Sequence, residues 1–235
     1  MTKTKRPEAI LFDLGSTLLH DSQSGALSVR VRSLLKSETF APFVKEGFEL
    51  PAELADAGET VYREGLGEFN VREWLGKHID PNGSDPSGTP DALEGFIRST
   101  ILSYSPPQDA SRVLNDLIRL GIPMAVVSNS IFSSDLLKRD IERLSVPEAV
   151  QFVISSAEFG FRKPHPAIFE AAVKKLNTIP STTWYVGDLW ENDVVGSTGA
   201  GLVPVWLNAH AAQPENSIPH HRVKNWTEFG ELLGV

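Results

Sequence analysis

The feature that most constrains this chain is the regular alternation, from residue 106 onward, of helical patterns and short apolar runs. Short apolar runs separated by amphipathic helical segments are typical of buried parallel strands. We expect strands at 123–127, 152–154, 184–186 and 203–207, and helices at 113–120, 133–144 and 165–177. The alternation predicts an α/β fold, in which helices cover both faces of a Rossmann-like parallel sheet.

A further apolar run, Ile10-Leu11-Phe12, lies near the N-terminus and ends at Asp13. From about residue 24 to residue 103 the sequence loses strand character, and apolar residues recur at helical spacing. We expect about four helices there, interrupted by a loop at 80–90 that is rich in Pro and Gly. The chain is therefore predicted to have an α/β core formed by residues 1–20 and 106–235, with residues 21–105 inserted as an all-helical domain.

The composition excludes several classes of protein. The 235 residues include no cysteine, which rules out disulfides, thiolate nucleophiles and Cys-ligated metal sites. The formal net charge of −8 argues against a broad nucleic-acid surface. No stretch approaches the ~18 apolar residues of a membrane helix, and the basic N-terminus lacks the apolar region of a signal peptide. We expect a cytoplasmic protein that binds neither nucleic acid nor membrane.

Polar residues of particular kinds follow the expected strands of the core. They are Asp13, Ser128, Asn129, Lys163, Asp188 and Asp193. In an open α/β sheet the carboxyl ends of the strands lie along one edge, where ligands bind. The sequence therefore predicts a cluster of carboxylates beside a hydroxyl group and a lysine.

Such a cluster suits phosphoryl transfer to and from a small phosphorylated molecule. A carboxylate such as Asp13 can attack phosphorus and carry the group as an aspartyl phosphate. A divalent cation held by carboxylates, a backbone carbonyl and water neutralises the charge, and Mg²⁺ prefers these oxygen ligands. Ser128 and the backbone near Asn129 can donate hydrogen bonds to phosphoryl oxygens, while Lys163 supplies a fixed positive charge.

Four segments, in their order along the chain, resemble the four motifs of the haloacid dehalogenase (HAD) superfamily of hydrolases. They are the strand that ends at Asp13, then Val-Val-Ser-Asn, Lys-Pro-His-Pro-Ala-Ile-Phe and Val-Gly-Asp-Leu-Trp-Glu-Asn-Asp. The resemblance spans about residues 12–207 and places the helical insertion where this superfamily carries a C1-type cap. The site residues it implies are Asp13 and Lys163 for catalysis, Ser128, Asn129 and Lys163 for phosphate binding, and Asp13, the carbonyl of Gly15, Asp188 and Asp193 for Mg²⁺.

The resemblance breaks at Gly15. Phosphatases of this superfamily have the motif Asp-x-Asp-Gly-Thr, whose second Asp is the general acid and base, and Gly15 stands in its place. General acid–base catalysis contributes about 10² to 10⁴ in rate. Alkyl phosphates should therefore be poor substrates unless another group supplies the proton, whereas acyl and aryl phosphates should suffer less. The candidate substitutes are His20, Asp21, Lys45, Lys77 and His78.

Two other functions stay open on the sequence alone. One is a dehalogenase-type hydrolase that attacks carbon from Asp13 without a metal, since such members of the superfamily also lack the second Asp. The other is a catalytically degenerate member that binds or regulates, although the retention of Asp13, Ser128, Lys163 and Asp188 counts against it. The sequence does not indicate which metabolite is the substrate, and we expect a monomer or a homodimer.

Overall fold

The computed structural model describes residues 6–25, 27–43, 68–79, 89–144, 147–208 and 218–235. Its centre is a sheet of six parallel strands in the order β5-β4-β1-β6-β7-β8. The strands are β1 (Ala9–Phe12), β4 (Met124–Ser128), β5 (Val150–Ser155), β6 (Thr183–Gly187), β7 (Val203–Leu207) and β8 (His221–Val223). The predicted α/β class is confirmed, and every strand expected from the sequence is present.

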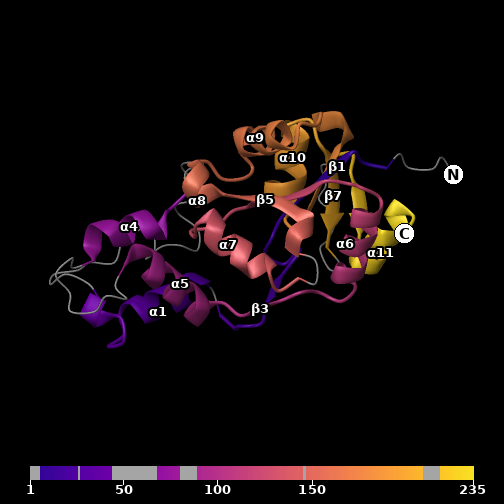
Figure 1. Ribbon diagram of the computed structural model, residues 1–235. Helices are drawn as coiled ribbons and strands as arrows, with labels where there is room; N and C mark the ends of the chain where they lie inside the picture. Colours follow the sequence, from indigo (N-terminus) through magenta and orange to yellow (C-terminus); the bar gives the residue numbers. More distant parts are fainter. Residues whose placement is uncertain (1–5, 26, 44–67, 80–88, 145–146, 209–217) are drawn as a thin grey trace.

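Helices cover both faces of the sheet (Figure 1). On one face lie α6 (Ala110–Arg119) and α11 (Trp226–Leu233), and on the other lie α9 (Pro166–Leu176) and α10 (Gly196–Gly199). Alternate residues of β1 divide between these faces, with Ile10 and Phe12 in the apolar cluster of α6 and α11, and Leu11 in that of α9. Burial on both faces explains why β1 is apolar throughout.

Shorter helices complete the core. α7 (Ser134–Ile141) and α8 (Ser156–Phe159) pack beside β5. Single turns of 3₁₀-helix lie at Pro147–Ala149 and Pro180–Thr182, and a further one lies at Ala41–Phe43 in the inserted segment. A π-helix at Trp190–Val195 leads into α10. The expected helices at 113–120, 133–144 and 165–177 correspond to α6, α7 and α9.

The described helices of residues 21–105 lie at one end of the molecule, away from α6 and α11 (Figure 1). Both α1 (Leu27–Leu35) and α4 (Val71–His78) pack on α5 (Pro90–Ile101). α5 begins after Thr89, whose hydroxyl accepts a hydrogen bond from the N–H of Ala92 at 3.3 Å. One of the four expected helices, near residues 54–66, lies outside the described residues. Residues 80–88 of the expected loop also lie outside them. Among the described helices, none has the length and apolar character needed to cross a membrane.

A two-stranded antiparallel ribbon links the inserted helices to the core. It pairs β2 (His20–Asp21), where the chain leaves the core, with β3 (Tyr104–Ser105), where it returns. The sequence does not predict these strands because each has only two residues.

The last two elements of the chain, β8 and α11, are also absent from the sequence-based expectation. β8 reads His-Arg-Val and lies at the edge of the sheet, so its composition is not that of a buried strand. α11 begins after Asn225, whose side chain accepts a hydrogen bond from the N–H of Glu228 at 2.9 Å. Trp226 then stacks on Phe12, with ring centroids 5.7 Å apart, and closes the core on that face.

We expect Gly196→Ala to lower the free energy of unfolding by about 1 to 3 kcal/mol. A Cβ at Gly196 would lie 2.9 Å from the ring of Phe169 and 2.9 Å from Cα of Pro164, so packing must shift. Gly199→Ala in the same helix is the matched control, because a Cβ there meets nothing within 4 Å and Ala favours helix. Urea denaturation measures both variants, and equal stabilities would contradict this account of the packing.

Candidate active site

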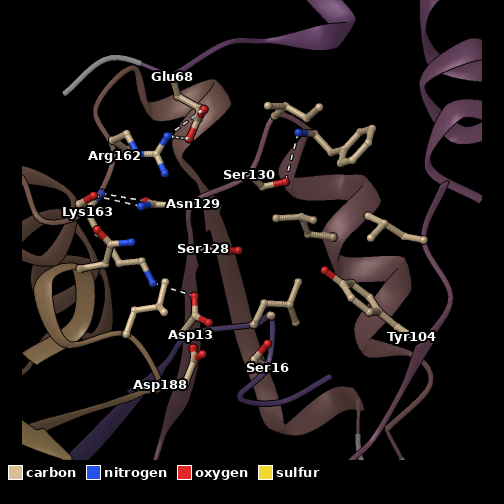
Figure 2. Close-up of a pocket in the computed structure, with 18 of the residues that line it drawn as sticks. Asp13, Ser16, Glu68, Tyr104, Ser128, Asn129, Ser130, Arg162, Lys163 and Asp188 are labelled. Carbon is tan, nitrogen blue, oxygen red and sulfur yellow. Dashed lines mark hydrogen bonds and ion pairs between the residues drawn. The ribbon is translucent and has the colours of Figure 1, made fainter. Parts of the chain in front are cut away.

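Five of the six polar residues expected at the strand ends line one pocket (Figure 2), and the sixth, Asp193, lies beside two of them. Asp13 directly follows β1, Ser128 is the last residue of β4, and Asp188 directly follows β6. β1 pairs in parallel with both β4 and β6, so these three residues lie at the same edge of the sheet. They line a cavity of about 320 Å³, to which the loop between α8 and α9 adds Lys163.

Lys163 is the most constrained residue of the site. Its side chain is 2% exposed, and its ammonium group donates hydrogen bonds to Oδ1 of Asp13 (2.6 Å), Oδ1 of Asp193 (2.7 Å) and the hydroxyl oxygen of Tyr185 (2.7 Å). Tyr185 donates in turn to the carbonyl of Val127 at 3.0 Å. Burial alone would lower the pKa of Lys163, but Asp13 and Asp193 raise it above the ordinary value, so the group stays charged.

Asn129 holds the backbone of Lys163 in place. Its Nδ2 donates to the carbonyl of Lys163 at 2.9 Å, and its Oδ1 accepts from the N–H of Lys163 at 2.7 Å. The side chain of Asn129 is thus used within the protein. The hydroxyl of Ser128, in contrast, points into the pocket (Figure 2).

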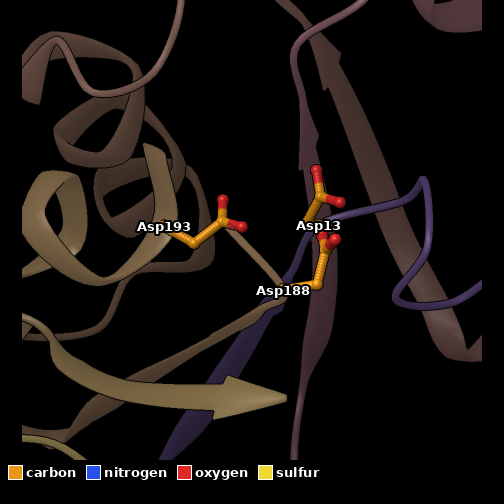
Figure 3. A group of neighbouring side chains, drawn as sticks. All are labelled: Asp13, Asp188 and Asp193. Carbon is orange, nitrogen blue, oxygen red and sulfur yellow. The ribbon is translucent and has the colours of Figure 1, made fainter. Parts of the chain in front are cut away.

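Two hydrogen bonds position the backbone of Asp188. Nε1 of Trp206 and Nδ2 of Asn208 both donate to its carbonyl, at 2.9 and 3.0 Å. The carboxylate lies beside those of Asp13 and Asp193 (Figure 3), and no described residue forms an ion pair with it. Burial, followed by the charges of Asp13 and Asp193, raises the pKa of Asp188 to about 7.

The three carboxylates carry more negative charge than Lys163 can balance. One oxygen of each of Asp13, Asp188 and Asp193 lies within 4.8 Å of the others. Asp193 uses Oδ1 for Lys163 and Oδ2 for the N–H of Leu189 (2.9 Å), which leaves Asp13 and Asp188 to face a ligand. Burial raises the pKa of Asp13 to about 6, although Lys163 opposes the shift. A hard divalent cation would balance the excess charge, so this oxygen donor set fits Mg²⁺.

Gly15 also lines the pocket, and the space beside it is open. A Cβ built on Gly15 would have the hydroxyl oxygen of Tyr104, at 3.7 Å, as its nearest neighbour among the described residues, and its φ lies outside the left-handed region. Packing therefore does not exclude a side chain at this position. The next residue, Ser16, has a φ of 59°, which is the left-handed region that favours glycine.

None of the described candidates for a substitute proton donor lines this pocket. Each is held by a neighbour: His20 by the carbonyl of Ser16, Asp21 by Arg30, Lys77 by Glu73, and His78 by the carbonyl of Trp74. Lys45 lies outside the described residues.

Sequence reasoning missed two tyrosines at the site. Tyr185 lies within the apolar strand β6, where the pattern indicates only a core residue, yet its hydroxyl contacts Lys163. Tyr104 lies in β3 and lines the pocket opposite Asp13. No sequence signal distinguishes either hydroxyl from that of an ordinary buried tyrosine.

Comparison with known proteins identifies relatives over most of the chain. The family model for haloacid dehalogenase-like hydrolases matches residues 7–201. Pyrimidine 5'-nucleotidase YjjG of Escherichia coli (strain K12) is 32% identical over 142 residues, which cover 60% of this chain and 62% of that protein. Glyceraldehyde 3-phosphate phosphatase of Pyrococcus abyssi (strain GE5 / Orsay) is 32% identical over 202 residues, which cover 85% of this chain and 81% of that protein.

Solved structures share the fold. The crystal structure of 2-haloacid dehalogenase from Pseudomonas syringae pv. Tomato DC3000 matches with a TM-score of 0.64 over 96% of this chain and 97% of that chain. The two sequences are 18% identical, so the likeness concerns the fold alone.

We expect Asp188→Asn to stabilise the metal-free protein more at about pH 8 than at about pH 5. The pKa of Asp188 is raised from 3.8 to about 7 in the folded protein, so between these values the folded protein binds a proton that the unfolded chain has lost. The stability of the wild type therefore falls as the pH rises through this window, by at most about 1.4 kcal/mol per pH unit. The variant lacks this dependence.

Urea denaturation of both proteins at several pH values, with a chelator present, measures the difference in unfolding free energy. A difference that stays constant from about pH 5 to about pH 8 would contradict the raised pKa of Asp188.

Proposed function

Because the chain belongs to the haloacid dehalogenase-like hydrolases, we propose that it is a Mg²⁺-dependent phosphatase that acts on a small phosphorylated metabolite. The observation that carries this proposal is the ammonium group of Lys163, held between Asp13 and Asp193 where the sheet meets the pocket. A cation fixed beside a nucleophilic carboxylate suits a reaction in which phosphoryl oxygens carry negative charge. Relatives named as a pyrimidine 5'-nucleotidase and a glyceraldehyde 3-phosphate phosphatase support the assignment.

Asp13 is the proposed nucleophile. Its carboxylate oxygen attacks phosphorus, the bond from phosphorus to the ester oxygen breaks, and the enzyme carries the group as an aspartyl phosphate. Water then attacks phosphorus, which releases inorganic phosphate and restores the carboxylate of Asp13. The hydrogen bond from Lys163 to Oδ1 of Asp13 orients the carboxylate, so that its other oxygen faces the pocket (Figure 2).

Ser128 and the backbone N–H groups that follow it are the proposed donors to the phosphoryl oxygens. The proposed Mg²⁺ ligands are the carboxylates of Asp13 and Asp188 and the carbonyl of Gly15, with Asp193 behind them. When bound, the ion neutralises charge on the phosphate and on these carboxylates. The ammonium group of Lys163 offsets the negative charge that remains on Asp13 and Asp193.

We also propose that residues 21–105 are a cap on a core of residues 1–20 and 106–235. Glu68, Arg98 and Leu102 from the inserted segment line the pocket together with Asp13 and Lys163 from the core. A cavity of about 320 Å³ has the size of sites that bind small molecules. The names of the relatives, a pyrimidine nucleotidase and a glyceraldehyde 3-phosphate phosphatase, refer to substrates of this class.

A metal-free dehalogenase fits the site less well. Asp188 places a second carboxylate beside Asp13, with no ion-pair partner among the described residues. Without a divalent cation this charge would repel a substrate that itself carries a carboxylate. A degenerate binding protein is also disfavoured, because the contacts of Lys163 hold the nucleophile in a geometry that binding alone does not need.

We also propose the partners, the location and the oligomeric state of the protein. The proposed partner is the small phosphorylated substrate. The net charge of −8 argues against nucleic acid as a further partner. From the sequence we propose a cytoplasmic location and a monomeric or homodimeric state.

We expect Asp13→Asn to lower phosphate release with Mg²⁺ at least about 10³-fold, because the amide cannot form the aspartyl phosphate. The assay uses a panel of alkyl, aryl and acyl phosphates. Asp135→Asn, an exposed carboxylate on α7, is the matched control and should keep the wild-type rate. An unchanged rate in Asp13→Asn would contradict the covalent mechanism, and metal-free halide release from 2-haloacids by the wild type would support the dehalogenase instead.

We expect Mg²⁺ to raise the melting temperature more at about pH 7.5 than at about pH 5.5. The pKa of Asp188 is about 7 and that of Asp13 about 6, so protons compete with the metal at the lower pH. Asp188→Asn should lose most of the shift, while Asp135→Asn should keep it. Equal shifts at the two pH values would show that Mg²⁺ binds elsewhere.

A further inference from the structure

Hydrolysis of an alkyl phosphate in this pocket requires a proton donor. When Asp13 displaces the alcohol, the ester oxygen leaves as an alkoxide, which is too basic to depart without a proton. Asp13 is the nucleophile and must be ionised. The three ammonium hydrogens of Lys163 are held by Asp13, Asp193 and Tyr185, so Lys163 is not available as the donor.

Other polar residues of the pocket are less suited to this task, and Asp188 is already a proposed Mg²⁺ ligand. Glu68 is paired with Arg162 at 3.4 Å and accepts a hydrogen bond from Ser156 at 2.8 Å. Ser16, Ser128 and Ser130 are alcohols, with no advantage in acidity over the departing alcohol. A phenol is far more acidic than an alcohol, and Tyr104 is the phenol whose hydroxyl faces the pocket.

Tyr104 is placed where a proton donor is needed. Its hydroxyl oxygen lies 3.7 Å from the position that a Cβ of Gly15 would occupy, two residues along the chain from Asp13. In Figure 2 it points toward the side of the pocket where Asp13, Ser16 and Ser128 lie. Among the described residues, no hydrogen-bond partner engages this hydroxyl, so it is free to contact a ligand.

The surroundings of Tyr104 suit both of its protonation states. Burial raises the pKa of Tyr104 to about 12, although Arg98 opposes the shift, so the phenol holds its proton near neutral pH. The guanidinium of Arg98 lies 4.3 Å from the centre of the Tyr104 ring and is itself held by Asp140 at 2.5 Å. The charge of Arg98 lowers the cost of forming the phenolate, although burial still favours the phenol.

We propose that Tyr104 is the general acid and base of the reaction, in place of a carboxylate at position 15. This role rests on the proposed phosphatase function. In the first step the Asp13 oxygen bonds to phosphorus, the bond to the ester oxygen breaks, and that oxygen takes the Tyr104 proton and leaves as the alcohol. In the second step the Tyr104 phenolate takes a proton from water, whose oxygen bonds to phosphorus. The bond to Asp13 breaks, and phosphate, the carboxylate and the phenol are restored.

The test compares substrates with poor and good leaving groups in full-length Tyr104→Phe with Mg²⁺. For the best alkyl phosphate of the panel, kcat/KM should fall about 10²- to 10⁴-fold, because the alkoxide loses its proton donor. For acetyl phosphate and 4-nitrophenyl phosphate, whose leaving groups need no proton, kcat/KM should fall less than about tenfold. These two substrates should show a burst of leaving group followed by slow turnover, because the base for the second step is missing.

Gly15→Asp in the Tyr104→Phe background is the rescue. Among the described residues, a Cβ at Gly15 has only the Tyr104 hydroxyl near it, and we expect kcat/KM for the alkyl phosphate to recover at least about tenfold. An unchanged melting temperature and an unchanged Mg²⁺ shift in Tyr104→Phe show that the fold and the metal site are intact. Equal losses of kcat/KM for all leaving groups, or no loss, would overturn the role of Tyr104 while the phosphatase function stands. No phosphate release by the wild type from any substrate would overturn both.

Discussion

The buried ammonium group of Lys163 is the interaction on which the rest of the site depends. A buried charge must be paired, since removing one partner costs about 3 to 5 kcal/mol. The acceptors of Lys163 come from three places, namely the end of β1, the strand β6 and the π-helix that follows β6. Asn129, which follows β4, fixes the backbone of the same residue. One residue thereby joins β4, β1 and β6 into a single arrangement.

The same arrangement concentrates negative charge. Asp13, Asp188 and Asp193 lie together against one lysine, and burial raises the pKa of Asp13 and of Asp188 because each ionised carboxylate loses contact with water. Proton uptake and cation binding are two ways to relieve this excess, and they exclude each other at Asp188. The affinity for a divalent cation and the response of the fold to pH are therefore one property of this cluster.

The parts of the fold and site that were predictable are those with a repeating physical pattern. Apolar runs identify the central strands because both faces of the sheet are buried, and parallel pairing then brings Asp13, Ser128 and Asp188 to one edge. β8 is not predicted from the sequence, because an edge strand needs little apolar surface. The contact of Lys163 with Tyr185 and the approach of Tyr104 to Gly15 depend on tertiary packing between distant segments, which no local pattern encodes.

The position of Tyr104 links proton transfer to the docking of the inserted helices. α5 is joined to the core by buried polar contacts, in which Arg98 pairs with Asp140 and Glu94 accepts hydrogen bonds from the N–H and hydroxyl of Ser133. The same Arg98 lies against the ring of Tyr104. A carboxylate at position 15 would belong to the core and would reach the pocket wherever the helices lie. In the proposed mechanism the proton donor is instead Tyr104 of β3, which lies against Arg98 of α5, so the nucleophile and the acid come from different parts of the chain.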